Sequence, residues 1–436
     1  MKPLTPEQSM YTCVRCGACR DACPTLDITG READGPRGRV LMARSLLEDR
    51  IPVNAEIEEQ MSRCLLCSAC VDACPVNVQV PEIVMLAKEK IAEHKKSPFL
   101  VRTLKRFFFN HLLPHPRRLQ FLGHLLWLYQ QSGLRWLVHK LGILKLFPDS
   151  AQQMEAVLPD LLPPSERKPL PSFTPGCSEQ NKRAGKVALF RGCIMDVMFR
   201  ETNRHSIELL ARSGFDVVVP DDQVCCGALM YHNGQKDTTL ELAKKNIEVF
   251  EKLDVDYIIS NAGGCGAMLK EYEELFRHEP EWLERARAFC HKIRDISEVI
   301  VEQGTLPKAV GNGETVTYQP SCHLQYVMQV KRAPEQLLSR VANLHYRPLP
   351  ESNLCCGSAG IYNLLQPKMA GDILHKKMGY VKETSAHVII TANPGCLLQM
   401  KAGVHSEGLQ NSVKVVHIVD LLAESVERAE KQASTG

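Results

Sequence analysis

Eight cysteines near the N-terminus constrain this 436-residue chain more than any other feature. They form two runs with one spacing: three thiols at every third position, a fourth after three intervening residues, then a proline. Three thiols on one tight loop can bind three irons of a single iron–sulfur cube, which directs the fourth thiol away from it. The spacing therefore predicts [4Fe–4S] ligation. The runs are Cys13, Cys16, Cys19, Cys23 with Pro24, and Cys64, Cys67, Cys70, Cys74 with Pro75.

The fourth cysteine of each run is expected to complete the other cluster, as in bacterial ferredoxins that hold two clusters. Zinc normally takes two separated pairs of thiols, so a third Cys in the same register fits zinc poorly. A chain of this length can bury a large core, so a disulfide framework is not expected either. The predicted ligands are Cys13, Cys16, Cys19 and Cys74 for the first cluster, and Cys64, Cys67, Cys70 and Cys23 for the second.

The composition is that of an ordinary globular protein with several domains, with 44% hydrophobic and 24% charged residues. A net charge of +3 without a dense basic run excludes nucleic acid as an expected partner. The 18 cysteines and the polar start of the chain predict a reducing compartment, hence the cytoplasm. The longest uncharged run, 119–134, is shorter than the roughly 20 apolar residues of a spanning helix.

Residues 1–96 are expected to form an all-helical ferredoxin domain. A turn at 34–36 is followed by apolar residues at helical spacing over 40–47, so a helix is predicted between the two cysteine runs. Two arginines of this linker have two interpretations: Arg37 and Arg39 either neutralise the anionic clusters or cap solvent-facing turns.

Two further segments separate this domain from the rest of the chain. Residues 97–148 are rich in Leu, Phe, Trp and basic side chains, which fits helices packed between domains or on a partner, or an interfacial patch against anionic lipid. The aromatic residues Phe107 to Phe109, Trp127 and Trp136 are predicted to be core or interface. Residues 149–185 carry many prolines and predict a stiff, extended connector.

From Lys186 onward the chain repeats itself, with copies predicted at 186–312 and 313–436. Each copy contains one Cys, then Cys-Cys-Gly, then one further Cys, and corresponding cysteines are offset by 129, 130 and 131 residues. The positions are Cys193, Cys225, Cys226 and Cys265 in the first copy, and Cys322, Cys355, Cys356 and Cys396 in the second.

Short apolar runs alternate with helical patterns in each copy, which predicts α/β domains with parallel sheets. The cysteines follow the apolar runs, so they are expected at the carboxyl ends of the strands, where open α/β sheets bind ligands. We therefore predict a metal centre in each copy or at their interface, either a further iron–sulfur cluster or zinc, because four thiolates suit both. The alternative is that these cysteines are small buried hydrophobes or redox-active thiols. Gly227 and Gly357 are expected to let the backbone approach the centre closely.

Three other candidates are interpreted as structural. Cys177 and Cys290 have no counterpart in the other copy and are expected to be structural or exposed thiols. His323 follows Cys322, but the first copy has Ile194 at that position, which favours a packing histidine over a ligand.

The two cysteine runs, the DGPRGR linker at 34–39 and the two Cys-Cys-Gly repeats together resemble the iron–sulfur subunits of glycolate oxidase (glycolate dehydrogenase). The resemblance covers nearly the whole chain and is also marked at 264–272 and 354–360. In the wider Cys-Cys-Gly family each copy ends in C-x-x-C. Here Ala262 and Asn393 replace the first thiol of that pair, which leaves four cysteines per copy.

The resemblance implies an electron-transfer subunit. A partner subunit carrying FAD would oxidise glycolate, or a related 2-hydroxy acid such as D-lactate, and a quinone-type acceptor would take the electrons. This chain has no complete G-x-G-x-x-G fingerprint, in agreement with flavin on the partner only. The expected location is the cytoplasm, peripheral on the inner face of the membrane. The alternatives are a heterodisulfide- or thiol-reducing catalytic subunit, a subunit like the C subunit of anaerobic glycerol-3-phosphate dehydrogenase, and a metal-stabilised assembly or sensor module.

Overall fold

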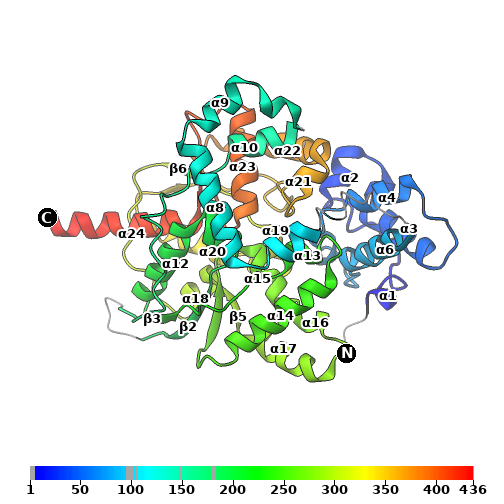
Figure 1. Cartoon of the computed structure of the whole chain (residues 1–436), viewed down its shortest axis with the longest axis horizontal. Coiled ribbons are helices and arrows are strands. Elements are labelled where there is room, and N and C mark those ends of the chain that lie inside the picture. Colours follow the sequence, from blue (N-terminus) through cyan, green and yellow to red (C-terminus); the bar gives the residue numbers. More distant parts are fainter. Residues whose placement is uncertain (1–4, 95–102, 104–105, 148, 178–182, 436) are drawn as a thin grey trace.

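The computed structural model describes residues 5–94, 103, 106–147, 149–177 and 183–435. The N-terminal part is helical, as the sequence predicts, and the two cysteine runs lie in the loops between its helices (Figure 1). The long helices α3 and α6 pack against each other and bury Val40, Leu46, Ile83 and Val84. The elements are α1 (Pro6–Ser9), α2 (Pro24–Thr29), η1 (Glu32–Asp34), α3 (Pro36–Leu47), α4 (Ala55–Ser62), α5 (Ala69–Asp72) and α6 (Val80–His94).

A second helical segment follows and leaves much of its apolar surface exposed. Phe109 and Leu119 are buried against the first repeat, but Phe107, Phe121 and Trp136 are more than half exposed. Of the aromatic residues that were predicted to be core or interface, only Phe109 is a core residue. For the others, an interface with a partner stays a prediction. The elements are η2 (Phe107–Leu112), α8 (Pro116–Gln131), α9 (Leu134–Lys140), η3 (Ile143–Leu146) and α10 (Asp149–Ala156).

The first repeat is built on a five-stranded sheet in the order β1-β3-β2-β4-β5. All pairs are parallel except β1 with β3, and β1 comes from the proline-rich segment, which therefore adds an edge strand to the sheet instead of only connecting domains. Phe199 separates the two helices α11 and α12 that follow β2. The elements are β1 (Phe173–Thr174), β2 (Gly185–Phe190), α11 (Ile194–Met198), α12 (Arg200–Arg212), β3 (Phe215–Val218), α13 (Ala228–Tyr231), α14 (Lys236–Phe250), β4 (Tyr257–Ser260), α15 (Gly263–Lys270), α16 (Tyr272–Leu275), α17 (Pro280–Lys292), β5 (Ile293–Asp295) and α18 (Ile296–Glu302).

The second repeat has a four-stranded parallel sheet in the order β7-β6-β8-β9. Strand β8 corresponds to β4 of the first copy, and both are buried apolar runs, as expected for strands covered by helices on both faces. The elements are β6 (Thr315–Tyr318), α19 (Cys322–Tyr326), α20 (Ala333–Ser339), β7 (His345–Tyr346), α21 (Tyr362–Leu365), α22 (Pro367–Thr384), β8 (Val388–Thr391), α23 (Pro394–Ser406), β9 (Lys414–His417) and α24 (Ile418–Thr435).

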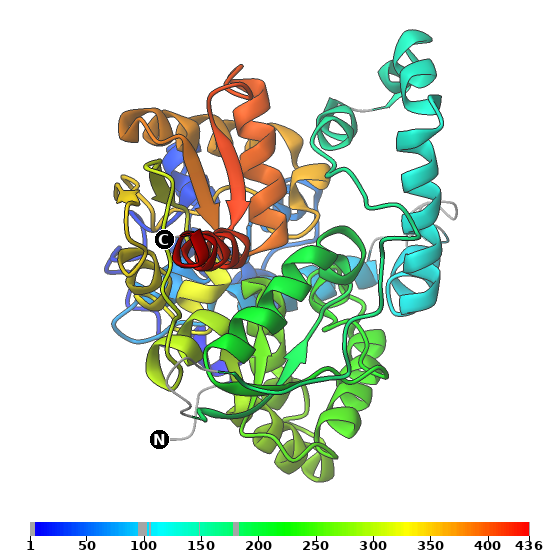
Figure 2. The same cartoon turned by 90° about the vertical axis from the view of Figure 1, so that its left-hand side faces the viewer.

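The two sheets meet at the ends of β4 and β8, where the Gly263 amide donates to the Ala392 carbonyl over 3.1 Å. The ferredoxin domain lies at one end of the molecule and α24 extends from the opposite end (Figure 1). Helices α8 and α9 stand at one side of the body, as the cyan and teal ribbons of Figure 2 show. In the part of the chain that the structure describes, no helix combines the length and apolarity needed to cross a bilayer.

Candidate functional site

The two cysteine loops have the same backbone geometry. Arg15 and Leu66 precede the second cysteine of each run with φ of 58° and 53°, and Gly17 and Ser68 follow it with φ of 90° and 61°. Left-handed residues on both sides of a cysteine curl the loop around a central space. Three of these four residues are not glycine, and a positive φ is strained for them. Such strain is common at functional sites.

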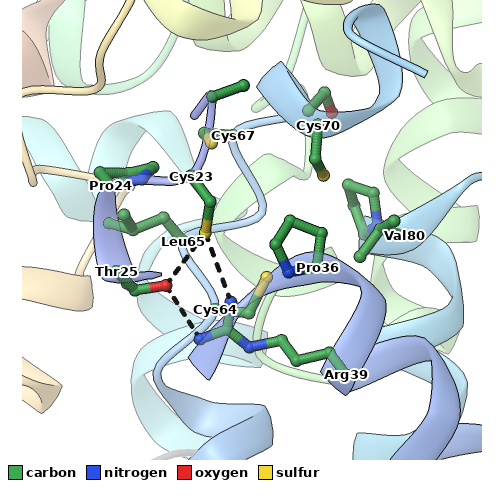
Figure 3. Close-up of a pocket in the computed structure, with 13 residues that line it drawn as sticks. Cys23, Pro24, Thr25, Pro36, Arg39, Cys64, Leu65, Cys67, Cys70 and Val80 are labelled. Carbon is green, nitrogen blue, oxygen red and sulfur yellow. Dashed lines mark hydrogen bonds between the residues drawn. The ribbon is translucent and has the colours of Figure 1, made fainter. Parts of the chain in front are cut away.

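The second loop and the last thiol of the first run surround one cavity of about 330 Å³ (Figure 3). Its cysteines are Cys23, Cys64, Cys67 and Cys70, the set that the spacing assigns to the second cluster. Apolar residues make up most of the remaining wall, with Pro36, Leu65 and Val80 among them. The structure thus brings the four predicted ligands together, and their binding of a cluster stays a prediction.

The first loop and the last thiol of the second run surround a neighbouring cavity of about 400 Å³. It is lined by Cys13, Cys16, Cys19 and Cys74, the set predicted for the first cluster, and Cys70 and Val80 separate it from the second cavity. The two predicted clusters would therefore be neighbours. Cys16 is exposed, so this cavity lies near the protein surface.

A buried arginine faces the second cavity. Arg39 is 2% exposed, and its guanidinium donates to the Thr25 hydroxyl over 3.1 Å and to the Gln60 carbonyl over 3.2 Å. It also lies 3.9 Å from the Cys23 sulfur. Burial lowers the pKa of Arg39, but the nearby Cys64, Cys23 and Asp34 outweigh burial, and the pKa is raised above its usual value. Of the two interpretations of Arg39, the structure supports charge compensation over the capping of a solvent-facing turn.

The residues around both cavities fit an anionic iron–sulfur cluster. Each cavity is lined by the four thiols predicted as its ligands. The charged side chains in its lining are arginines, and the lining contains no carboxylate. Burial raises the pKa of the Cys67 and Cys70 thiols well above the usual value, so metal binding there must displace protons. Arg37 is turned toward the first cavity, with its guanidinium donating to the Arg15 carbonyl over 3.2 Å and paired with Glu32.

The four cysteines of each repeat also converge. In the first copy they follow β2, β3 and β4, and the Cys193 and Cys225 sulfurs are 3.2 Å apart. Hydrogen bonds continue the series from Cys225 to Cys226 and on to Cys265. The second copy has the same series, which runs through Cys322, Cys355, Cys356 and Cys396.

The donors in each repeat are soft thiols at the carboxyl ends of parallel strands, which suits iron–sulfur or zinc binding. Among the described residues, no group of three or more His, Cys, Asp or Glu side chains is arranged to hold a single metal ion. The eight cysteines thus remain predicted ligands, and the identity of the metal stays open between a cluster and zinc.

The glycine of each Cys-Cys-Gly motif forms a left-handed turn. Gly227 and Gly357 have φ of 88° and 90°, and a Cβ on Gly357 would lie 2.9 Å from the Ala370 carbonyl oxygen. On Gly227 it would lie 3.0 Å from the Thr239 methyl. The glycines therefore allow a left-handed turn packed against the helix that follows. The Gly357 amide also donates to the Cys355 sulfur over 3.4 Å, and a close approach of the backbone to a bound centre stays a prediction.

Two residues near the second repeat's thiols have surroundings that the sequence did not predict. Lys377 on α22 is 2% exposed, and burial lowers its pKa to about 8 although Cys356 and Cys355 act to raise it. His323 does more than pack: its Nδ1 lies 3.5 Å from the Cys322 sulfur and its ring stacks on His232. The helical spacing of apolar residues in α22 predicts a surface position for Lys377. Its burial beside the thiols can therefore be seen only in the fold.

The other two cysteines lie away from these groups. Cys177 is exposed, and Cys290 donates to the Leu269 carbonyl over 3.2 Å at the end of a helix. Both positions agree with the structural or exposed thiols that the sequence predicts.

The cavities and the repeat centres lie side by side in a fixed order. The two ferredoxin cavities share Cys70, and Cys67 packs in one apolar cluster with Cys322 and Cys355. Cys356 and Cys396 of the second copy pack in a further cluster that includes Cys265 of the first. The thiol groups therefore run from the first cavity to the second, then to the second repeat and last to the first repeat.

Comparison with known proteins matches the chain to three family models. A 4Fe–4S dicluster domain matches residues 9–78, the linker region of glycolate oxidase iron–sulfur subunits matches 100–158, and a cysteine-rich domain matches both 187–270 and 316–401. The dicluster match supports iron–sulfur binding by the N-terminal domain.

Similar proteins agree over the full length. The chain is 43% identical to a probable glycolate oxidase iron–sulfur subunit of Bacillus subtilis, with 97% of this chain and 96% of the relative covered. It is 26% identical to the glycolate oxidase iron–sulfur subunit of Escherichia coli over 98% and 97%. A lactate utilization protein A of Halalkalibacterium halodurans is 33% identical over 54% of this chain and 96% of its own. The chain therefore belongs to the family of glycolate oxidase iron–sulfur subunits.

Proposed function

We propose that this chain is the electron-transfer subunit of a glycolate-oxidising complex. A partner subunit with FAD would oxidise glycolate, or a related 2-hydroxy acid, to the 2-oxo acid, and this chain would carry the electrons one at a time to a quinone-type acceptor. The observation that carries the proposal is the unbroken order of four thiol groups through the molecule.

Each thiol group has a defined task in this scheme. Cys13, Cys16, Cys19 and Cys74 would hold the first cluster, and Cys23, Cys64, Cys67 and Cys70 the second. When bound, such clusters supply reversible one-electron redox chemistry, with potentials set by charge, hydrogen bonds and solvent exposure. Arg37 and Arg39 would balance the negative charge, and the apolar walls would exclude water from the sulfurs.

The surface at the first cavity suits contact with the flavin-bearing partner. Val14 is 71% exposed, Val76 is 43% exposed, and both line the cavity together with the exposed Cys16. Exposed apolar side chains next to a redox site allow a partner to dock closely and exclude water. Electrons would thus enter at the first cluster, and the repeats would form the far end of the path.

Helices α8 and α9 would hold the complex at the inner face of the membrane. Phe121, Leu125 and Trp136 are exposed, and the sequence from 97 to 147 contains basic residues but no Asp or Glu. An apolar face flanked by basic residues is typical of helices that lie on anionic lipid. A peripheral position would bring the far end of the path near membrane quinone.

The decisive experiment uses Cys19→Ser in the complex with its flavoprotein, purified without oxygen. Serine cannot replace the thiolate ligand of the first cluster, so glycolate should still reduce the flavin while reduction of the final acceptor is abolished. Flavin absorbance and acceptor reduction are measured on the same sample. The matched control is Cys177→Ser, because Cys177 is exposed and lies away from the thiol groups.

Normal acceptor reduction in Cys19→Ser would refute the relay. Metal analysis and electron paramagnetic resonance of the wild type provide a second check, because the ferredoxin domain should bind about eight irons if two four-iron clusters are present. A colourless, iron-poor protein from oxygen-free preparation would refute the cofactor assignment as well.

A further inference from the structure

A small chamber lies where the ferredoxin domain meets both repeats, lined by residues of α6, α13, α16 and α19 and of the turns beside them. Its walls are unusually rich in groups that exchange protons. They come from all three parts of the chain and include Glu82, Tyr231, His232, Glu271, Glu274 and His323. None of these residues is used in the electron path described above.

The chamber adjoins the second repeat's thiols. His232 and His323 stack with ring centroids 5.6 Å apart and planes at 27°, and the His323 Nδ1 lies 3.5 Å from the Cys322 sulfur. Only two stacked rings therefore separate a molecule on the far face of His232 from the predicted centre. Only the position of the His323 ring between His232 and Cys322 matters here, and not its protonation.

The chamber holds protons at neutral pH. Burial raises the pKa of Glu271 to about 8, with a smaller effect from Glu82, so its carboxyl is protonated at neutral pH. Burial also raises the pKa of Glu82, although Arg277 opposes this. Burial lowers the pKa of His232 to about 3, so its ring is neutral and can donate or accept a hydrogen bond.

A large cleft adjoins the chamber and leads to solvent. It has a volume of about 790 Å³ and shares Leu66, Met85 and His232 with the chamber wall. Its lining also includes Ile91 and Leu365, and Leu365 is 55% exposed. A ligand with a polar ring and an apolar tail would find a surface for each part.

We propose that the chamber binds the ring of a quinone and is the place where this acceptor is reduced. This inference rests on the proposed relay and names the place beside the second repeat where electrons would leave it. The two carbonyl groups would accept hydrogen bonds from Glu271 and its neighbours, and the apolar tail would lie in the cleft.

The step balances as follows. The quinone would gain two electrons, which derive from glycolate oxidised on the partner and which an iron–sulfur centre held by the Cys322 group would supply one at a time. It would also gain two protons, one from Glu271 and one from water in the cleft, so both carbonyl oxygens would become hydroxyls. A second water in the cleft would then return a proton to the Glu271 carboxylate.

Binding is tested on the full chain with its iron–sulfur centres, using a short-chain ubiquinone and titration calorimetry. Leu275→Trp fills the chamber, because Leu275 lines it, and should weaken binding at least about tenfold. Glu271→Gln keeps the shape and a hydrogen-bonding group, so its dissociation constant should stay within about threefold of wild type. Should Leu275→Trp fail to fold, His232→Phe removes a polar contact at the chamber wall and serves in its place.

Turnover is tested on the complex with the flavoprotein. Glu271→Gln should lower glycolate-dependent ubiquinone reduction at least about tenfold, because a positioned general acid contributes about 10²–10⁴-fold. The matched control is Glu273→Gln, two residues away, whose carboxylate pairs with Arg287 on the surface. Glycolate should still produce the reduced ferredoxin signals in every variant.

Equal ubiquinone binding by wild type and Leu275→Trp, or equal turnover by Glu271→Gln and Glu273→Gln, would overturn the chamber assignment. Preferential binding of a disulfide probe in the chamber would also overturn it. Failure of the relay looks different, because glycolate would then not reduce the ferredoxin clusters in the wild type.

Discussion

At the scale of single residues, Arg39 shows how the chain prepares a site for an anionic group. Its guanidinium is buried beside Cys23 and is held by Thr25 and Gln60. A buried cation is stable only where negative charge and hydrogen bonds surround it. The thiolates of a bound cluster would supply that charge.

Replacing Arg39 by Met should therefore affect both stability and redox chemistry. Removal of one partner of a buried charge pair costs about 3 kcal/mol, and the reduced form of the second cluster loses its nearest cation. We expect a lower denaturant midpoint and a more negative reduction potential for that cluster alone, measured by a redox titration followed by electron paramagnetic resonance. Arg44→Met, on the same helix but paired with Glu48 and not lining either cavity, is the control and should leave that reduction potential unchanged.

Gly357 carries the second residue-scale prediction. Its φ of 90° and the nearby Ala370 carbonyl make Gly357→Ala strained, so we expect a loss of about 2–3 kcal/mol in the free energy of unfolding. Gly371→Ala lies within α22, where an added Cβ meets no atom within 4 Å. That control should gain about 1 kcal/mol, since alanine is the better helix former. Equal stabilities in chemical denaturation would contradict this account of the motif.

At the scale of secondary-structure elements, α8 and α9 carry large apolar side chains that are exposed, among them Phe121, Leu125 and Trp136. The double variant Leu125→Glu, Trp136→Glu should lower sedimentation with anionic vesicles at least about tenfold, since two charges replace two apolar anchors. Phe173→Glu is the control, because Phe173 is 52% exposed on the edge strand β1. Binding should also weaken as salt rises. Vesicle binding that is equal in all forms would favour partner contact instead.

The contact between α12 and α24 predicts a dependence on pH. The His205 Nδ1 on α12 donates to the Asp420 carboxylate on α24 over 2.8 Å. Burial lowers the pKa of His205, but the hydrogen bond and charge of Asp420 outweigh it, so the folded pKa lies above the usual value. The extra stability is thus fully present below the unfolded pKa of about 6.5 and is lost as the pH rises through the folded pKa.

His205→Asn keeps a neutral donor and removes the charge. The wild type should therefore have a higher free energy of unfolding in urea than this variant, and the difference should be largest at pH 6 and smallest at pH 8.5. A difference that is constant over this range would show that the ring stays neutral.

At the scale of the whole molecule, the order of the thiol groups makes the two repeats unequal. Cys67 packs with Cys322 and Cys355, whereas the first repeat contacts the second through Cys265. Cys322→Ser should leave the ferredoxin signals reducible but prevent reduction of the first repeat's centre. Cys193→Ser should leave the second repeat's centre reducible. Electron paramagnetic resonance during reductive titration distinguishes them, and the reverse pattern would contradict the order.

Spacing alone predicted which thiols group together, because three cysteines on one loop have only one local arrangement. The parallel sheets were also predictable, since apolar runs alternate with helical patterns in each copy. The chamber was not. Glu82, His232 and Glu271 are far apart in sequence, and each belongs to a helix end with no motif of its own. Arg39 was noticed in the sequence, but only the packing of α3 against α4 decides between its two roles.

The last helix of the second repeat packs on the first repeat. Val419, Leu422 and Val426 of α24 are 1% exposed, and Asp420 also accepts from Thr202 of α12 over 2.8 Å. During synthesis, residues 186–312 leave the ribosome long before residues 418–435 do. The first copy therefore keeps an apolar surface exposed until its covering helix has been synthesised, so it can reach its full stability only when the second copy is complete.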